Sequence, residues 1–296
     1  MHDAILHDEV VALLERYYLH GDRSSVTVYR GAVQSDGRPE YVASMLERTE
    51  PHDDDYRIFR AFIDDQDVIL DIGANWGYSV GSIWACGATT RVVSFEPLTL
   101  YSACLERIVE LRPGRFDYRT VALGAMRGRL RFVVPVVNGT ALTALTSADP
   151  SPYLVGLCSN IVNHITEWMP DLAGHADVKL YEFESCVEML DDVLATEVFD
   201  FPINQISAIK VDVEGLEDQV IQGALGTIAK FMPLIMAEGG NRNERLVRQL
   251  EPLGYFYTER QGDVLVPVKG ITESANGFFL HPDHCLFYRD AGIYAD

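Results

Sequence analysis

The sequence predicts an α/β protein whose core is a doubly wound, mostly parallel sheet of seven strands. Two observations support this prediction. Short apolar runs alternate with segments of helical length along most of the chain, which is typical of βαβ units. Several runs also end in an acidic residue or a glycine, where a buried parallel strand would lead into a turn and a helix. With 296 residues, 48% of them hydrophobic, the chain can bury one large domain with additions.

In the N-terminal part, residues 1–55, the pattern of apolar residues predicts a helical extension that precedes the core. Residues 7–18 place apolar side chains at helical spacing, and the polar stretch 50–56 interrupts this pattern. A second helical pattern over 56–63 leads into one long domain, which we expect to span residues 56–296. The N-terminal helices would also offer a surface for a homodimer.

The core elements follow in chain order. Five parallel strands are expected at short apolar runs, namely 68–73, 91–96, 116–123, 206–213 and 233–238. Helices are expected to follow four of these strands, at 78–86, 98–111, 216–230 and 243–253. Two closing strands complete the sheet, at 255–260 and 285–289.

The alternating rhythm breaks between the third and fourth strands. An extra strand is expected at 129–135 and a short helix at 187–194. Residues from about 136 to 177 carry prolines, glycines and aromatic side chains without any βαβ rhythm. We expect this segment to be an insertion that covers a site as a lid.

The charge balance narrows the classes of function. The chain carries 24 basic and 44 acidic residues, so its formal net charge is −20. Nucleic acids and anionic membranes both attract basic surfaces, so we expect neither partner. No run reaches the ~20 apolar residues of a membrane span, and no signal-peptide pattern occurs at the start. Five widely spaced cysteines without a CxxC pair are typical of a reducing compartment, so we expect a cytoplasmic protein.

The first candidate binding feature is the strand-to-helix turn DIGANWG at 71–77. Its glycines allow a tight turn and let a ligand approach the backbone closely. Their spacing is not the GxGxxG pattern of dinucleotide binding, which argues against an NAD-dependent oxidoreductase. Asp71 would repel a pyrophosphate, whereas it would accept a cationic ligand such as S-adenosylmethionine, which carries a sulfonium and an ammonium group.

Further acidic residues are expected at the same edge of the sheet. Glu96 ends the second strand, where a carboxylate can accept both ribose hydroxyls of an adenosine ligand. Asp212 ends the fourth strand, and an ionisable residue is costly next to an apolar run unless it is paired or functional. We expect Glu217 to stabilise the N-terminus of the helix that follows.

Together these motifs resemble the FkbM family of S-adenosylmethionine-dependent methyltransferases. The resemblance covers roughly residues 56–260 and rests on DIGANWG (71–77), FEP (95–97), VALG (121–124) and IKVDVEGLE (209–217). It implies a class I, Rossmann-like methyltransferase fold and O-methylation. Acceptors in that family are typically sugars, glycans or polyketide-derived hydroxyls.

The resemblance also implies roles for individual residues. The methionine part of the cofactor would be held by Asp71, Gly73, Asn75 and Gly77. Glu96 would bind the ribose, and Val121 and Ala122 would border the adenine. Asp212 would lie next to the transferred methyl group or the amino group of the cofactor.

A hydroxyl is a poor nucleophile at neutral pH, so a general base or a metal ion is expected beside it. The candidate catalytic residues are Asp212, Glu214, Glu238 and His164. Asp212 and Glu238 could also supply oxygens to Mg²⁺. We expect the acidic run beside His52 to be a solvated stretch or a helix start.

Several readings stay open from the sequence. We expect O-methylation of a small molecule, with a sugar or oligosaccharide precursor as the first choice. A polyketide or other natural-product hydroxyl is the main alternative, and N- or C-methylation is another. A catalytically inactive binding protein with the same fold is disfavoured because Asp71, Glu96 and Asp212 are all present.

Overall fold

The computed structural model describes residues 2–24, 26–28, 34–35, 37–142, 145–146, 148, 154–168, 177–272 and 274–295. The chain forms two compact units. The smaller unit consists of residues 1–36 with 129–185, and the larger of residues 37–128 with 186–296. Our expected extension over 1–55 is therefore divided, because its first part groups with the inserted region.

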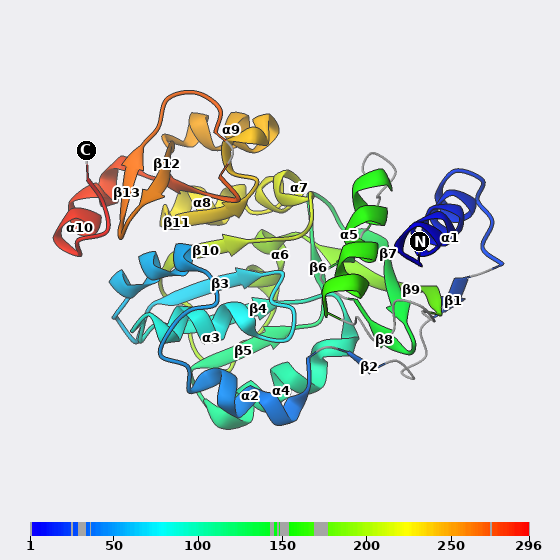
Figure 1. The fold of residues 1–296 in the computed structure, drawn as a ribbon. Helices are drawn as coiled ribbons and strands as arrows, with labels where there is room; N and C mark the ends of the chain where they lie inside the picture. Colours follow the sequence, from blue (N-terminus) through cyan, green and yellow to red (C-terminus); the bar gives the residue numbers. More distant parts are fainter. Residues whose placement is uncertain are drawn as a thin grey trace. The chain divides into compact units, whose positions relative to one another are not determined.

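The larger unit is built on an eight-stranded sheet (Figure 1). Its order is β13-β12-β14-β11-β10-β3-β4-β5. The run from β11 to β5 is parallel, whereas β14 is antiparallel to β11, β12 to β14, and β13 to β12. The strand bounds are β3 Val68–Ile72, β4 Arg91–Phe95, β5 Phe116–Arg119, β10 Ile206–Val211, β11 Leu234–Glu238, β12 Phe256–Gln261, β13 Val264–Pro267 and β14 Asn276–Leu280. The predicted doubly wound α/β fold is confirmed, with eight strands instead of seven.

The strand order places a switch point between β3 and β10. The chain runs from β3 to β4 and β5 in one direction and then returns to add β10 on the other side of β3. In open α/β sheets, ligands bind beyond the carboxyl ends of the strands at such a point. The turn after β3 and the turn after β10 therefore flank the expected site.

Two groups of helices accompany this sheet. One contains α2 (Pro39–Leu46), η1 (Asp54–Ala61), α3 (Tyr78–Ala85), η2 (Thr99–Tyr101) and α4 (Ser102–Leu111). The other contains α6 (Leu190–Thr196), α7 (Glu217–Gln222), α8 (Leu225–Phe231), η6 (Gly240–Arg242), α9 (Glu244–Leu250) and η7 (Glu251–Leu253).

The alternation of β3 decides which side chains meet which helices. Leu70 and Ile72 share a core with Val220 of α7 and Ile228 of α8. Because successive side chains of a strand point to opposite faces, Asp71 points the other way. There its carboxylate meets Ser79 of α3.

Two expected elements are interrupted. The predicted helix 216–230 is split into α7 and α8 at Gly223, where a Cβ atom would lie 2.0 Å from the Gly124 carbonyl oxygen. The predicted strand 116–123 also divides, because β6 (Ala122–Leu123) leaves the large sheet and pairs with the end of β9.

One expectation of element type is wrong, and one expected helix starts later than predicted. Residues 285–289 form the helix α10 (Cys285–Asp290), preceded by η8 (Pro282–His284), and not a closing strand. Tyr288 is buried in that helix while Leu286 and Phe287 are exposed, and a short apolar run alone does not distinguish this pattern from a strand. The first residues of the helix predicted at 187–194 end a strand, and α6 begins at Leu190.

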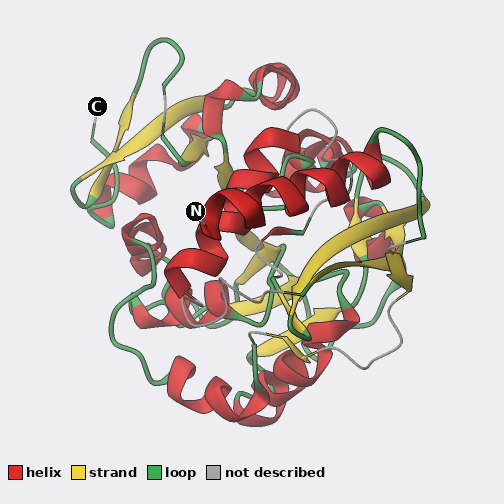
Figure 2. Cartoon of the chain, turned by 45° about the vertical axis from the view of Figure 1, so that its right-hand side comes forward, coloured by secondary structure: helices red, strands yellow, loops and turns green. Residues whose placement is uncertain are grey.

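The smaller unit joins the N-terminus of the chain to the insertion (Figure 2). Helix α1 (His2–Tyr18) packs against α5 (Leu154–Trp168). Its sheet has the order β1-β9-β7-β8-β2, and the expected extra strand is confirmed as β7. The bounds are β1 Val26–Val28, β2 Gln34–Ser35, β7 Gly128–Val137, β8 Thr140–Ala141 and β9 Val178–Glu188.

One apolar core connects these parts of the smaller unit. Leu14 of α1 shares it with Ile161 of α5 and Leu180 of β9. The buried carboxylate of Glu182 accepts a hydrogen bond of 2.6 Å from the Tyr17 hydroxyl and pairs with Arg23. Within the described ranges, no helix is long and apolar enough to cross a membrane.

Candidate active site

The turn at 71–77 has a backbone that only glycine allows at one position. Gly73 has φ +80°, and a Cβ atom there would lie 1.8 Å from the backbone oxygen of Asp212. Gly77 has φ +102° and precedes the first residue of α3. Asn75 is also left-handed, with φ 53°. The β3 turn therefore lies directly against the end of β10, with its backbone shaped for a closely bound ligand.

Glu96 ties the end of β4 to this turn. One carboxylate oxygen accepts the Asn75 N–H at 2.8 Å and the other accepts the Leu98 N–H at 2.8 Å. Burial raises the pKa of Glu96 to about 7, although these two N–H groups act in the opposite direction. Each oxygen keeps a further lone pair, so Glu96 can also accept hydroxyl groups of a ribose.

Asp71 supports the turn from within the core. Its side chain is fully buried, and one oxygen accepts hydrogen bonds from the hydroxyls of Ser79 at 2.7 Å and Ser94 at 2.9 Å. The Asp71 carboxylate is thus not presented to solvent.

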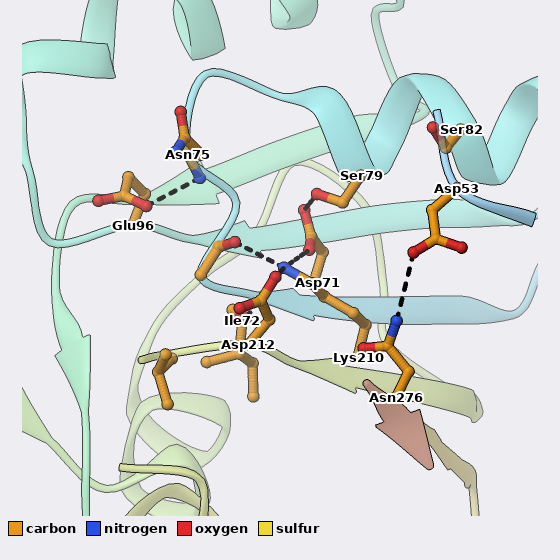
Figure 3. Close-up of polar contacts among 12 residues, drawn as sticks. Asp53, Asp71, Ile72, Asn75, Ser79, Ser82, Glu96, Lys210, Asp212 and Asn276 are labelled. Carbon is orange, nitrogen blue, oxygen red and sulfur yellow. Dashed lines mark hydrogen bonds and ion pairs between the residues drawn. The ribbon is translucent and has the colours of Figure 1, made fainter. Parts of the chain in front are cut away.

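Lys210 is a central residue of the site to which the sequence analysis gave no role. It is paired with Asp71 across β10 and β3, and Asp71 is paired with Ser94 across β3 and β4, so the three side chains share one face of the sheet. Its ammonium lies 3.3 Å from Asp71 Oδ1 and 3.5 Å from Asp212 Oδ2 (Figure 3). Burial acts to lower the pKa of Lys210, but the charges of Asp212 and Asp71 outweigh it and raise that pKa above its ordinary value. The available signal was a lone lysine inside an apolar run.

The carboxylates predicted at the ends of β10 and β11 come together. The side chain of Asp212 is 44% exposed. Burial, the charges of Asp212 and Glu217 and a hydrogen bond with Asp212 raise the pKa of Glu238 to about 7. Loss of hydration, with repulsion from Glu238 and Asp212, raises the pKa of Glu214 to about 8, although its side chain keeps contact with solvent. Burial, together with the crowding of like charges, therefore brings the pKa values of Glu214 and Glu238 close to neutral pH.

The helix-start role predicted for Glu217 is confirmed. Its carboxylate accepts the backbone N–H groups of Val213 at 3.2 Å and Gly215 at 3.0 Å, just before α7 begins. The same hydrogen bonds hold the loop that carries Glu214, whose φ is 56°. Glu217 thus fixes the backbone on both sides of Glu214.

The remaining predicted residues lie in three places. Val121 is part of the core of the larger unit, and Ala122 belongs to β6. The backbone N–H of Glu96 donates to the Arg119 carbonyl, which places the chain just before Val121 beside the ribose-binding candidate. His164 lies in α5 of the smaller unit, and its side chain is outside the described part of the chain.

Asp212 and Glu238 were the candidate ligands for Mg²⁺, and these two carboxylates do meet. Among the described residues, however, no group of three or more His, Cys, Asp or Glu side chains is arranged to hold a metal ion. Two carboxylates alone leave most of the octahedral shell of Mg²⁺ to other ligands.

The segment before η1 also reaches the site. Asp53 caps η1 by accepting the Asp55 N–H, so the acidic run is a helix start as expected. Asp53 Oδ2 lies 3.5 Å from Asn276 Nδ2, and Asn276 is paired with Glu238 across β14 and β11. His52 Nδ1 lies 2.6 Å from Ser82 Oγ, and burial lowers the pKa of His52.

The doubly wound sheet, the glycine turn after β3 and the acidic residues at the strand ends are typical of the class I, or Rossmann-like, methyltransferase fold. The family profile described as "Methyltransferase FkbM domain" matches residues 71–257, more than half of the chain. The chain therefore belongs to the FkbM methyltransferase family, as its motifs predicted. No curated protein matches it.

Solved structures of similar fold are distant. Methyltransferase FkbM from Methylobacillus flagellatus KT is 13% identical with a TM-score of 0.41, and the match covers 82% of this chain and 58% of that one. A precorrin-6Y C5,15-methyltransferase from Geobacter metallireducens GS-15 is 11% identical with a TM-score of 0.34, covering 86% and 91%. A SAM-dependent O-methyltransferase from Thermotoga maritima is 11% identical with a TM-score of 0.32, covering 90% and 69%.

Proposed function

We propose that the protein transfers a methyl group from S-adenosylmethionine to a hydroxyl of a small, uncharged molecule, with a sugar or glycan precursor as the first candidate. The observation that carries this proposal is the carboxylate group Asp212, Glu214 and Glu238 beside the cofactor turn, with two pKa values near neutrality. A hydroxyl acceptor needs a base of this strength, because an ordinary carboxylate is too weak to take its proton efficiently.

The residues present fit the cofactor. Glu96 has free lone pairs for the ribose hydroxyls, and its hydrogen bond from the Asn75 N–H places it beside the glycine turn. The exposed carboxylate of Asp212 offers a negative charge to the cationic end. When bound, the cofactor supplies a methyl group activated by the positive charge on sulfur.

When bound, S-adenosylmethionine would supply the methyl group to the acceptor oxygen and would keep the electrons of the broken carbon–sulfur bond. The Asp212–Glu238 pair would take the proton that the acceptor hydroxyl loses. We assign the base to the pair because Glu238, whose pKa is raised to about 7, is hydrogen-bonded to Asp212. Glu214 adds negative charge beside them, and most of the remaining catalysis is orientation of the two reactants.

The charge of the site favours uncharged acceptors. The carboxylates of Asp212, Glu214 and Glu238 lie together, and the whole chain carries a net charge of −20. A phosphorylated or carboxylated acceptor would be repelled at this edge of the sheet. A neutral polyketide hydroxyl is the second candidate, since it satisfies the same condition.

The first test is calorimetric titration with S-adenosylmethionine and S-adenosylhomocysteine, for the wild type and for Glu96→Ala. We expect micromolar binding by the wild type and at least a tenfold weaker affinity in the variant, because the ribose loses its acceptor. Folded wild-type protein that binds neither ligand would support an inactive binding protein instead.

The second test is transfer of a labelled methyl group to panels of neutral sugars, phosphorylated sugars and polyketide alcohols. We expect products from a neutral panel, with the methyl on oxygen by mass spectrometry and NMR. Because the proposed base is a side-chain pair, EDTA should leave the rate unchanged. A rate abolished by EDTA and restored by Mg²⁺ would replace that base with a metal-bound group.

A further inference from the structure

The ends of β3 and β10 at the switch point are joined by one side chain, one backbone hydrogen bond and one close backbone contact. The Asp212 N–H donates to the Ile72 carbonyl at 3.1 Å. The ammonium of Lys210 donates to the Gly73 carbonyl at 2.6 Å and lies 3.4 Å from the Ile72 carbonyl. The absent side chain of Gly73 lets the Asp212 carbonyl approach from the other strand. Lys210 therefore anchors the cofactor turn to β10.

The charges at this junction are not equally accessible. Asp71 is fully buried, and within the described residues its Oδ1 atom has no hydrogen-bond partner and faces the Lys210 ammonium. Lys210 is itself 2% exposed, whereas the side chain of Asp212 is 44% exposed. Two carboxylates and one ammonium leave one net negative charge, and only Asp212 can present it to a ligand.

We propose that Lys210 is a positioning residue for the cofactor, holding the Asp212 carboxylate and the Gly73 carbonyl where the sulfonium end of S-adenosylmethionine binds. The proposal rests on the proposed function only for the place of Asp212 beside the cofactor, and not on the identity of the acceptor. It gives a reason for a buried lysine beside two acidic residues, since a buried ion pair by itself adds little to stability.

A purely structural ion pair makes a different prediction. Replacing a buried pair by neutral residues of similar volume is often neutral for stability, whereas removing one partner leaves an unpaired charge. The double variant Lys210→Met/Asp71→Asn removes both buried charges together. If the pair served only the fold, this variant would fold and bind the cofactor like the wild type.

The experiment measures binding of S-adenosylmethionine and S-adenosylhomocysteine to the full chain by calorimetry, with thermal unfolding in parallel. The two ligands differ in the methyl group and the sulfonium charge. For the double variant we expect at least a tenfold loss of affinity for S-adenosylmethionine and a clearly smaller loss for S-adenosylhomocysteine. Lys230→Met, at an exposed lysine of α8, is the matched control and should bind both ligands normally. Unchanged affinities, or equal losses for both ligands, would overturn the proposal.

A second variant covers the case in which the double variant does not fold. Asp212→Asn alters a partly exposed side chain and should show the same selective loss for S-adenosylmethionine. If the ratio of the two affinities is unchanged, the Asp212 carboxylate does not interact with the sulfonium charge. Lys210 would then have no carboxylate to position, and the proposal would be overturned. Because only cofactor binding is measured, failure to find a hydroxyl acceptor would contradict the proposed function and leave this inference standing.

Discussion

At the scale of single residues, the carboxylates of the site lie in different electrostatic environments. Asp71 is buried beside a lysine and two hydroxyls, so its charge is compensated. Glu238 and Glu214 lose much of their hydration and lie beside other carboxylates, so the pKa of each is raised. Identical chemical groups thus receive different roles from their neighbours.

These raised pKa values predict how stability depends on pH. The pKa of Glu96 rises to about 7, that of Glu238 to about 7 and that of Glu214 to about 8 in the folded protein. The folded state then binds more protons than the unfolded state between about pH 4.5 and 8, so the free energy of unfolding should decrease as pH rises through that window. Denaturant unfolding at pH 5, 6, 7 and 8 measures this.

The variant Glu238→Gln isolates one contribution to that slope. An amide does not titrate, so the decrease in stability between pH 5 and pH 8 should be smaller than in the wild type. A variant whose stability falls with pH as steeply as the wild type would show that Glu238 does not titrate in this window. Glu244→Gln, at an exposed position of α9, serves as the control.

At the scale of elements, the turn after β3 packs against the end of β10, and this contact requires glycine at position 73. Gly73→Ala should destabilise the protein by more than about 2 kcal/mol and abolish cofactor binding, because the new methyl group would meet the Asp212 carbonyl and the φ is left-handed. Gly87→Ala is a matched control, since its φ of +94° is also left-handed but no atom lies within 4 Å of the added Cβ.

Denaturant unfolding and calorimetric titration of both variants separate the cost of the left-handed backbone from the steric clash with the Asp212 carbonyl. Gly87→Ala carries only the conformational cost, about 1–2 kcal/mol, and should bind the cofactor normally. Equal stability losses in the two variants would mean that the close approach of Asp212 to Gly73 is unimportant.

At the scale of the whole molecule, segments that are far apart in the sequence belong to the same compact unit. Residues 1–36 and 129–185 are far apart in the sequence, yet they build one compact unit with one core. The residues of this unit precede or interrupt the part that carries the cofactor motifs. Such additions are where members of a methyltransferase family can differ in their acceptors.

Because α1 and α5 share one apolar core, we expect a substitution in α1 to destabilise α5 in the insertion. Leu14 is fully buried and packs with Ile161 of α5, so Leu14→Ala should cost about 2–5 kcal/mol and speed hydrogen exchange in α5. Exchange in β3 and β10 of the larger unit should change far less. Leu19→Ala, at a residue 58% exposed, is the control and should leave exchange in α5 unchanged.

Much of the arrangement of the candidate site was predictable because parallel strands end at one edge of a sheet. Asp71, Glu96 and Asp212 could be placed together from strand periodicity and glycine spacing alone. The contacts of Lys210 could not, because they depend on the register between β10 and β3. Helix α10 was missed because its short apolar run fits either period. Only the structure shows that Leu286 and Phe287 are both exposed while Tyr288 is buried, which does not fit the alternation of a strand.

By itself, the sequence determined the α/β class, the order of the core elements, the family and the residues at the strand ends, since local periodicity and turn chemistry encode these features. The tertiary structure alone decided that Asp71 is buried against Lys210, that Asp212 is the exposed charge, and that Glu238 and Glu214 share one charged environment. It also decided that the N-terminus and the insertion form one unit. These properties arise from contacts between residues distant in the chain, and no local pattern records which distant partners will meet.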